Sequence, residues 1–90
     1  MLPVINLSSN SFDNVKVSGI DFTGTNANLD PQTVYNKDMS HGIYDGLNFT
    51  MKSFDGVNTD DASFEGCVMD FAKNTPQTRK KSDNSFQKKI

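Results

Sequence analysis

A five-residue period runs through the middle of this chain without a gap. Residues 37–71 divide into seven consecutive units, KDMSH, GIYDG, LNFTM, KSFDG, VNTDD, ASFEG and CVMDF. The third residue of each unit is mostly large and apolar, and the first is often small or aliphatic. A helix repeats every ~3.6 residues and a strand every two, so neither element alone explains this period. The stretch therefore predicts a repeat fold in which each unit makes the same short turn.

An earlier run, residues 5–29, has the same period in the units INLSS, NSFDN, VKVSG, IDFTG and TNANL. The first and third residues of a unit are expected to point inward from a short extended segment, and the last two to turn a corner. Glycine supports this assignment because it tolerates the backbone angles of such a corner. All glycines except Gly42 occupy the fifth place of their units: Gly19, Gly24, Gly46, Gly56 and Gly66.

The order of residue types in these units resembles the consensus of the pentapeptide-repeat family. That consensus is a small residue, a polar residue, Leu or Phe, and then two polar or small residues. The resemblance covers residues 5–29 and 37–71. It implies an all-β fold, a right-handed quadrilateral β-helix with four units per coil, and hence about three coils from these twelve units. The chain departs from the family pattern at four inward places, Asn10, Lys37, Lys52 and Thr59. It also has Phe or Met at most unit centres where the family usually has Leu.

The period divides the chain into a repeat body, residues 1–71, and a C-terminal tail, residues 72–90. Residues 30–36 interrupt the body, and Asp30 followed by Pro31 favours a short helical turn or a bulging loop at one corner. If this insert is looped out, unit five returns above unit one. The predicted inward columns are then Leu7, Ala27, Phe54; Phe12, Met39, Thr59; Val17, Tyr44, Phe64; and Phe22, Phe49, Met69.

Composition and charge separate the tail from the body. Apolar residues make up 34% and the mean hydropathy is -0.57, which suits a repeat fold in which only two places in five face inward. Residues 1–71 hold ten acidic side chains against three basic ones, whereas residues 72–90 hold six basic side chains against Asp83. The tail is expected to be flexible in isolation and basic enough to contact a partner.

The sequence offers few groups for catalysis or metal binding. His41 is the sole histidine, and no second soft ligand accompanies it as a zinc site requires. Cys67 stands at an inward place, where a thiol acts as a small apolar filler. Asp60 and Asp61 occupy one corner and are expected to be solvated. We therefore predict no enzyme activity, no cofactor, no metal site and no small-molecule substrate.

The prediction for function is a structural or protein-interaction module, an accessory or decoration subunit of a larger assembly such as a phage particle. It is expected to bind a protein partner, or further copies of itself, through its coil ends, insert and basic tail. The predicted contact residues are Val34, Tyr35, Arg79, Lys80, Lys81, Phe86, Lys88 and Lys89.

Two alternatives stay open. The resemblance implies a DNA mimic that inhibits gyrase, because some pentapeptide-repeat proteins act in that way and the body is acidic. The tail instead favours a small adaptor or a nucleic-acid-contacting protein, whose contact would be unspecific because Phe86 is the only aromatic residue there. A single cysteine, with no charged-then-apolar leader and no long apolar run, predicts an intracellular or assembly-bound product without a signal peptide or membrane contact.

Overall fold

Tight turns at the ends of the five-residue units shape the backbone in our computed structural model, which describes residues 5–76. In these turns the carbonyl of a central residue accepts the N–H of the residue three places on, as Phe12 does from Val15 at 3.1 Å. The fifth residue has a positive φ, +73° at Gly19 for example. Such a turn requires φ > 0 at this place. Nine other residues of fifth places share it: Asn14, Gly24, His41, Gly46, Met51, Gly56, Asp61, Gly66 and Phe71.

Polar side chains at the second place of the units hold the corners. The Asn48 side-chain oxygen accepts the N–H of Thr50 at 2.9 Å, and other units repeat the bond from Asn, Asp or Ser. Where the acceptor is a carboxylate, these bonds favour its charged form. Hydrogen bonds from the Ser40 hydroxyl and N–H accordingly hold the pKa of Asp38 below its ordinary value. The turn chemistry is therefore local and readable from the sequence.

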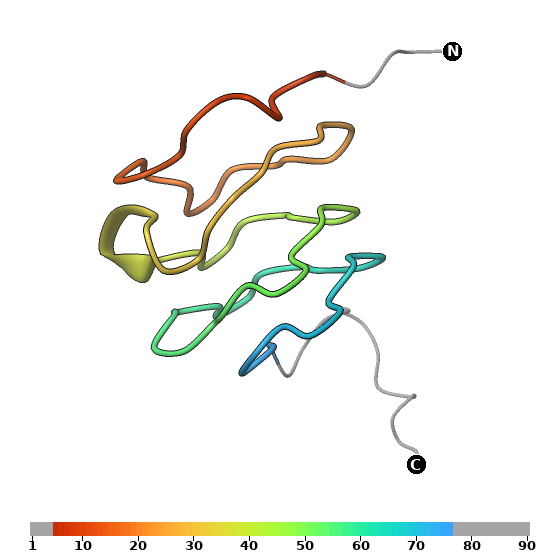
Figure 1. Cartoon of the computed structure of the whole chain (residues 1–90). Coiled ribbons are helices and arrows are strands. Elements are labelled where there is room, and N and C mark those ends of the chain that lie inside the picture. Colours follow the sequence, from red (N-terminus) through yellow and green to blue (C-terminus); the bar gives the residue numbers. More distant parts are fainter. Residues whose placement is uncertain (1–4, 77–90) are drawn as a thin grey trace.

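Successive layers of the chain lie one below the other, from the N-terminal segment at the top of Figure 1 to the C-terminal segment at the bottom. Backbone hydrogen bonds join each layer to the next through isolated parallel bridges. Most bridges pair residues twenty positions apart, which is four units. They are Ile5 with Thr25, Asp38 with Asn58, Ile43 with Ser63, Asn48 with Val68, and Ser53 with Lys73.

The prediction of an all-β, right-handed quadrilateral β-helix is wrong. The described residues form no strand, sheet or barrel; they contain isolated bridges and one short 3-10 helix, η1, Tyr35–Lys37. The molecule is compact, with extents of 38 × 36 × 24 Å, and is not a solenoid. The physical reason lies in the corners. Because the last two residues of a unit turn the chain, too few extended residues remain on each side to continue a bridge into a ladder.

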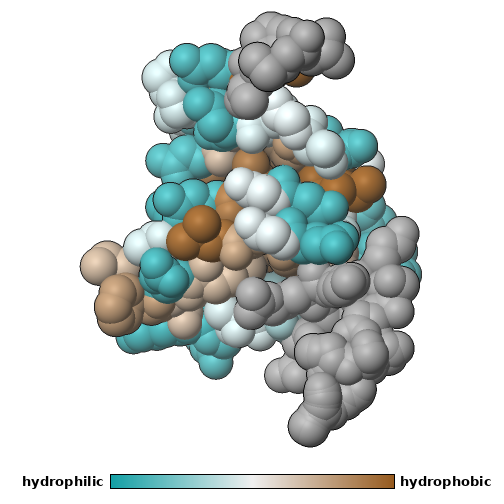
Figure 2. Space-filling model, turned by 90° about the vertical axis from the view of Figure 1, so that its right-hand side faces the viewer, coloured by the Kyte–Doolittle hydropathy of each residue, from teal (hydrophilic) through white to brown (hydrophobic). Residues whose placement is uncertain are grey.

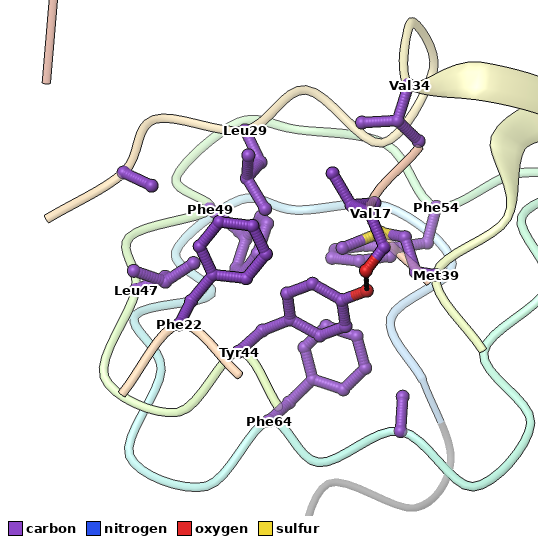
Figure 3. Close-up of a cluster of buried hydrophobic side chains, with 12 residues drawn as sticks. Val17, Phe22, Leu29, Val34, Met39, Tyr44, Leu47, Phe49, Phe54 and Phe64 are labelled. Atoms are coloured by element: carbon purple, nitrogen blue, oxygen red, sulfur yellow. Dashed lines mark hydrogen bonds between the residues drawn. The ribbon is translucent and has the colours of Figure 1, made fainter. Parts of the chain in front are cut away.

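The core is a single cluster of buried side chains in which aromatic rings dominate (Figure 3). Tyr44 stacks between Phe22 and Phe64, with ring centroids 5.6 and 5.2 Å away. The buried Tyr44 hydroxyl donates to the carbonyl of Val17 at 2.9 Å. Three layers thus meet at one ring, which lies beside further buried residues: Leu29, Val34, Met39, Leu47, Phe49 and Phe54.

The predicted register is correct within the second run and wrong across the insert. Tyr44 lies above Phe64 as expected, but the residue above Tyr44 is Phe22 rather than Val17. The bridge from Asp21 to Ile43 spans twenty-two residues, so every column shifts by one unit. Four predicted pairs across the insert are therefore not formed. They are Val17 with Tyr44, Phe22 with Phe49, Ala27 with Phe54, and Phe12 with Met39.

The shift arises because the insert is not looped out. It forms one side of its layer: Asn14 donates its N–H to the Thr33 carbonyl at 2.8 Å, and Tyr35 donates to Val15 at 3.0 Å. The short turn expected after Asp30 is confirmed, since the Asp30 carboxylate accepts the N–H of Gln32 at 3.0 Å. Seven residues thus occupy a side that five occupy elsewhere.

Candidate interaction surface

An exposed pair of large apolar residues, Met51 and Phe71, occupies one corner of the molecule; we call it the apolar corner. The exposed fractions are 74% for Met51 and 81% for Phe71. The two residues are twenty positions apart on neighbouring layers, and Met51 donates its N–H to the carbonyl of Asp70 at 2.8 Å. The same corner place thus repeats on two layers with a hydrophobic side chain each time.

The backbone of the apolar corner is unfavourable for these residue types. Met51 has φ +63° and Phe71 has φ +60°, a left-handed conformation that glycine adopts at many of the other corners. This conformation costs a residue with a Cβ atom roughly 1–2 kcal/mol. Neither side chain recovers this cost by burial in the core. Strain held without a packing benefit is a reason to look for a function at this corner.

A cleft separates two layers next to the apolar corner; we call it the interlayer cleft. Its volume is about 420 Å³. Amide and hydroxyl side chains line the cleft together with the apolar side chains of Ala27 and Leu47, so its walls are of mixed polarity. The lining residues are Ser8, Thr25, Asn26, Ala27, Asn28, Gly46, Leu47, Asn48, Thr50 and Lys52.

The cleft lies where the bonding between layers is interrupted. In the regular pattern, the second residue of a lower unit donates its N–H upward, as Val68 does to Leu47 at 3.1 Å. The carbonyl of the same residue accepts an N–H of the layer above; the Val68 carbonyl, for example, accepts the N–H of Phe49 at 2.8 Å. Asn48 is the equivalent residue in the cleft, and its N–H and carbonyl meet no backbone partner among residues 5–76. The N–H of Ala27 opposite bonds the Thr25 hydroxyl instead, at 3.4 Å.

A side chain of the insert replaces the missing bonds on the adjacent side of the molecule. The Gln32 amide donates to the carbonyls of Ser53 and Asp55, at 3.0 and 2.9 Å. These carbonyls correspond by place in the unit to those of Asn48 and Thr50. The two layers are therefore bridged beyond one end of the interlayer cleft and remain apart within it.

Lys52 is the charged residue of the cleft lining. Within the described part of the chain, no carboxylate forms an ion pair with it. The rest of the body is acidic: residues 5–76 hold ten acidic side chains and four lysines. Figure 2 shows one face of this body, on which apolar patches interrupt a largely hydrophilic surface.

The structure separates the two predicted contact residues of the insert. Tyr35 is 42% exposed and can reach a partner. Val34 is 3% exposed and packs in the core, so the expectation that its side chain contacts a partner is wrong. Val34 is buried because the insert forms a side of the body instead of a loop. The other predicted contact residues lie outside the described residues: Arg79, Lys80, Lys81, Phe86, Lys88 and Lys89.

The remaining candidate groups lie apart from the cleft lining. His41 and Asp61 are exposed corner residues whose Nδ1 and Oδ2 atoms are 3.5 Å apart, and Asp60 is exposed as expected. The Cys67 thiol packs against the core and donates to the Tyr44 carbonyl at 3.0 Å. Residues 5–76 contain no group of three or more His, Cys, Asp or Glu side chains placed to hold a metal ion. No helix in that range has the length and apolarity needed to cross a membrane.

Comparisons with known protein families, curated proteins and solved structures find no match to this chain. The assignment of the surface therefore rests on its own geometry. Sequence reasoning missed the apolar corner, although a signal exists: Met51 and Phe71 stand in the fifth place, where Gly, Asn or Asp is usual here. It also missed the interlayer cleft, which has no local signal because it results from how the insert is accommodated.

Proposed function

We propose that this chain is a non-enzymatic structural subunit that assembles with further copies of itself. In this assembly the apolar corner of one copy binds residues 77–90 of another. The observation that carries the proposal is the pair Met51 and Phe71, held in a strained backbone conformation and largely exposed. Two exposed hydrophobic side chains on neighbouring layers offer apolar surface that a partner can cover.

Charge favours a second copy as the partner. Residues 5–76 carry ten acidic and four basic side chains, and Asp70 directly precedes Phe71. Residues 77–90 carry five basic side chains and one acidic one, and they include Phe86 and Ile90. A basic segment with two large apolar residues therefore complements an acidic body with an apolar corner. Opposite charges also steer the two surfaces together.

Such a contact joins different surfaces on the two copies, and a contact of this kind continues into a ring or an open chain of subunits. This property suits a component of a larger particle. The predicted intracellular or assembly-bound location and the family resemblance stay predictions. The gyrase-inhibitor and nucleic-acid functions also stay predictions.

Light scattering coupled to size exclusion at low and high salt tests the proposal on the full chain. We expect species larger than a monomer at low salt and their loss at high salt, because charge attraction is screened. The double variant Met51→Asn, Phe71→Asn should be monomeric at both salts, and so should the triple variant Arg79→Gln, Lys80→Gln, Lys81→Gln. Ile20→Thr removes a different exposed apolar side chain and is the matched control. A wild-type monomer at low salt, or unchanged assembly in both variants, would overturn the proposal.

A further inference from the structure

We infer that the interlayer cleft binds an extended peptide segment with an acidic residue, taken up as an added strand between two layers. This site is distinct from the apolar corner and does not depend on the proposed self-assembly. Its ligand follows from three properties of the cleft: the backbone groups left unpaired, the shape and polarity of the walls, and the charge at its edge.

The unpaired backbone groups identify the ligand as a main chain. Asn48 presents an N–H and a carbonyl toward the layer above. In other units the carbonyl of the fourth residue also accepts from the layer above, so the Thr50 carbonyl is expected to point the same way. Asn48 is exposed, so these groups face solvent in the free protein and are open to a ligand. A peptide in extended conformation offers donors and acceptors that can pair with such an exposed stretch of backbone. Recognition would thus begin with main-chain hydrogen bonds.

The walls limit the side chains that such a peptide carries. The volume of about 420 Å³ falls within the range of ~300–1,000 Å³ usual for ligand sites. Asn26 is fixed by bonds with Leu7 and Asn6, but the exposed Asn28 side chain makes no hydrogen bond within residues 5–76. Its amide can serve the ligand. Small polar or β-branched side chains therefore fit better than large aromatic ones.

Lys52 decides the charge of the ligand. It is partly buried in the cleft lining and has no acidic partner among the described residues. An aspartate or glutamate of the peptide would supply that partner. Residues 77–90 of the chain, with five basic side chains, are by charge a poor occupant. The cleft and the apolar corner thus differ in the partner that each selects.

Fluorescence anisotropy with synthetic peptides tests this site on the full chain. The probe is a labelled, amidated peptide of alternating valine and threonine that ends in aspartate, compared with the same peptide ending in lysine. We expect the aspartate peptide to bind at least about threefold more tightly, the scale of a partly exposed ion pair. Lys52→Glu should reverse this preference. Hydrogen exchange should show protection of the Asn48 N–H when the peptide is bound.

Two further comparisons separate main-chain pairing from simple adsorption. An aspartate peptide N-methylated at alternate residues cannot donate its hydrogen bonds and should not bind. Asn28→Trp fills the cleft and should also abolish binding, whereas Asn10→Trp, outside the lining, should not. Equal binding of the methylated peptide, an unchanged preference in Lys52→Glu, or no binding of the aspartate peptide at all would overturn the inference. Denaturation midpoints of the variants show that each one is folded.

Discussion

Tyr44 donates its hydroxyl hydrogen to the carbonyl of Val17 across twenty-seven positions of sequence, at 2.9 Å and away from solvent. The bond joins two layers at the centre of the aromatic stack, so Tyr44→Phe should lower the free energy of unfolding by about 1 kcal/mol. The cost stays moderate because the Val17 carbonyl also accepts the N–H of Ile20 at 3.2 Å. Urea denaturation measures the change; equal stability of both proteins would contradict the role of the bond.

The same burial makes stability depend on alkaline pH. Burial, with a smaller effect from the charge of Asp38, raises the pKa of Tyr44 far above its ordinary value of 10.0. The folded state therefore holds this proton more tightly than the unfolded state. Stability from this group is complete below pH 10 and falls as the pH rises beyond it. In Tyr35→Phe, which leaves Tyr44 as the single tyrosine, tyrosinate absorbance should appear together with unfolding. Its appearance in the folded protein near pH 10 would contradict the prediction.

Gly42 is required by the ring of Tyr44 rather than by its own backbone angles. A Cβ atom at residue 42 would lie 2.2 Å from the Tyr44 hydroxyl oxygen and 2.4 Å from the adjacent ring carbon. Gly42→Ala should therefore destabilise the protein by about 2–3 kcal/mol, the upper range of overpacking in a core. Gly19→Ala is the matched control. At residue 19 a Cβ meets no atom within 4 Å, and only the φ of +73° opposes it, at about 1 kcal/mol. A larger loss for Gly19→Ala would refute the packing argument.

Gln32 links the insert to the layer below through two backbone carbonyls, those of Ser53 and Asp55. Gln32→Glu keeps the shape of the side chain but removes the amide donors and sets a negative charge against both carbonyls. We expect a loss of about 1–3 kcal/mol in unfolding free energy, with Gln32→Ala at the lower end. Thr23→Ala, at an exposed corner outside this contact, serves as the control. If Gln32→Glu unfolds at the wild-type urea concentration, the amide does not support the layer.

Replacement of Met51 or Phe71 by Asn should change the free energy of unfolding and the strength of self-assembly in opposite directions. Asn tolerates a left-handed backbone better than Met or Phe, so each change to Asn should raise stability by about 0.5–1 kcal/mol. The same changes remove the proposed contact and should lower the mass in solution. Thermal unfolding of a dilute sample, in which any assembly has dissociated, isolates the first effect. A loss of stability in both single variants would show that these side chains serve the fold.

Local interactions determined much of this molecule. The five-residue period placed the corners, because a left-handed residue and a polar side chain at the second place need only their neighbours in sequence. It also placed the inward aromatic residues: Tyr44 and Phe64 are buried at unit centres, and Tyr44 lies above Phe64 as the period requires. The turn after Asp30 followed from the same kind of local chemistry.

Only the tertiary structure decided how the layers meet. The insert forms a side of the body, which buried Val34, moved Phe22 above Tyr44, and left Asn48 without a backbone partner inside the interlayer cleft. Within residues 5–76 the bridges also stay isolated where the period alone suggested a β-helix, because the corners leave too few extended residues for a ladder. Periodicity specifies which way a residue faces. It does not specify which residue lies above it, because that depends on how seven residues fit a side that usually takes five.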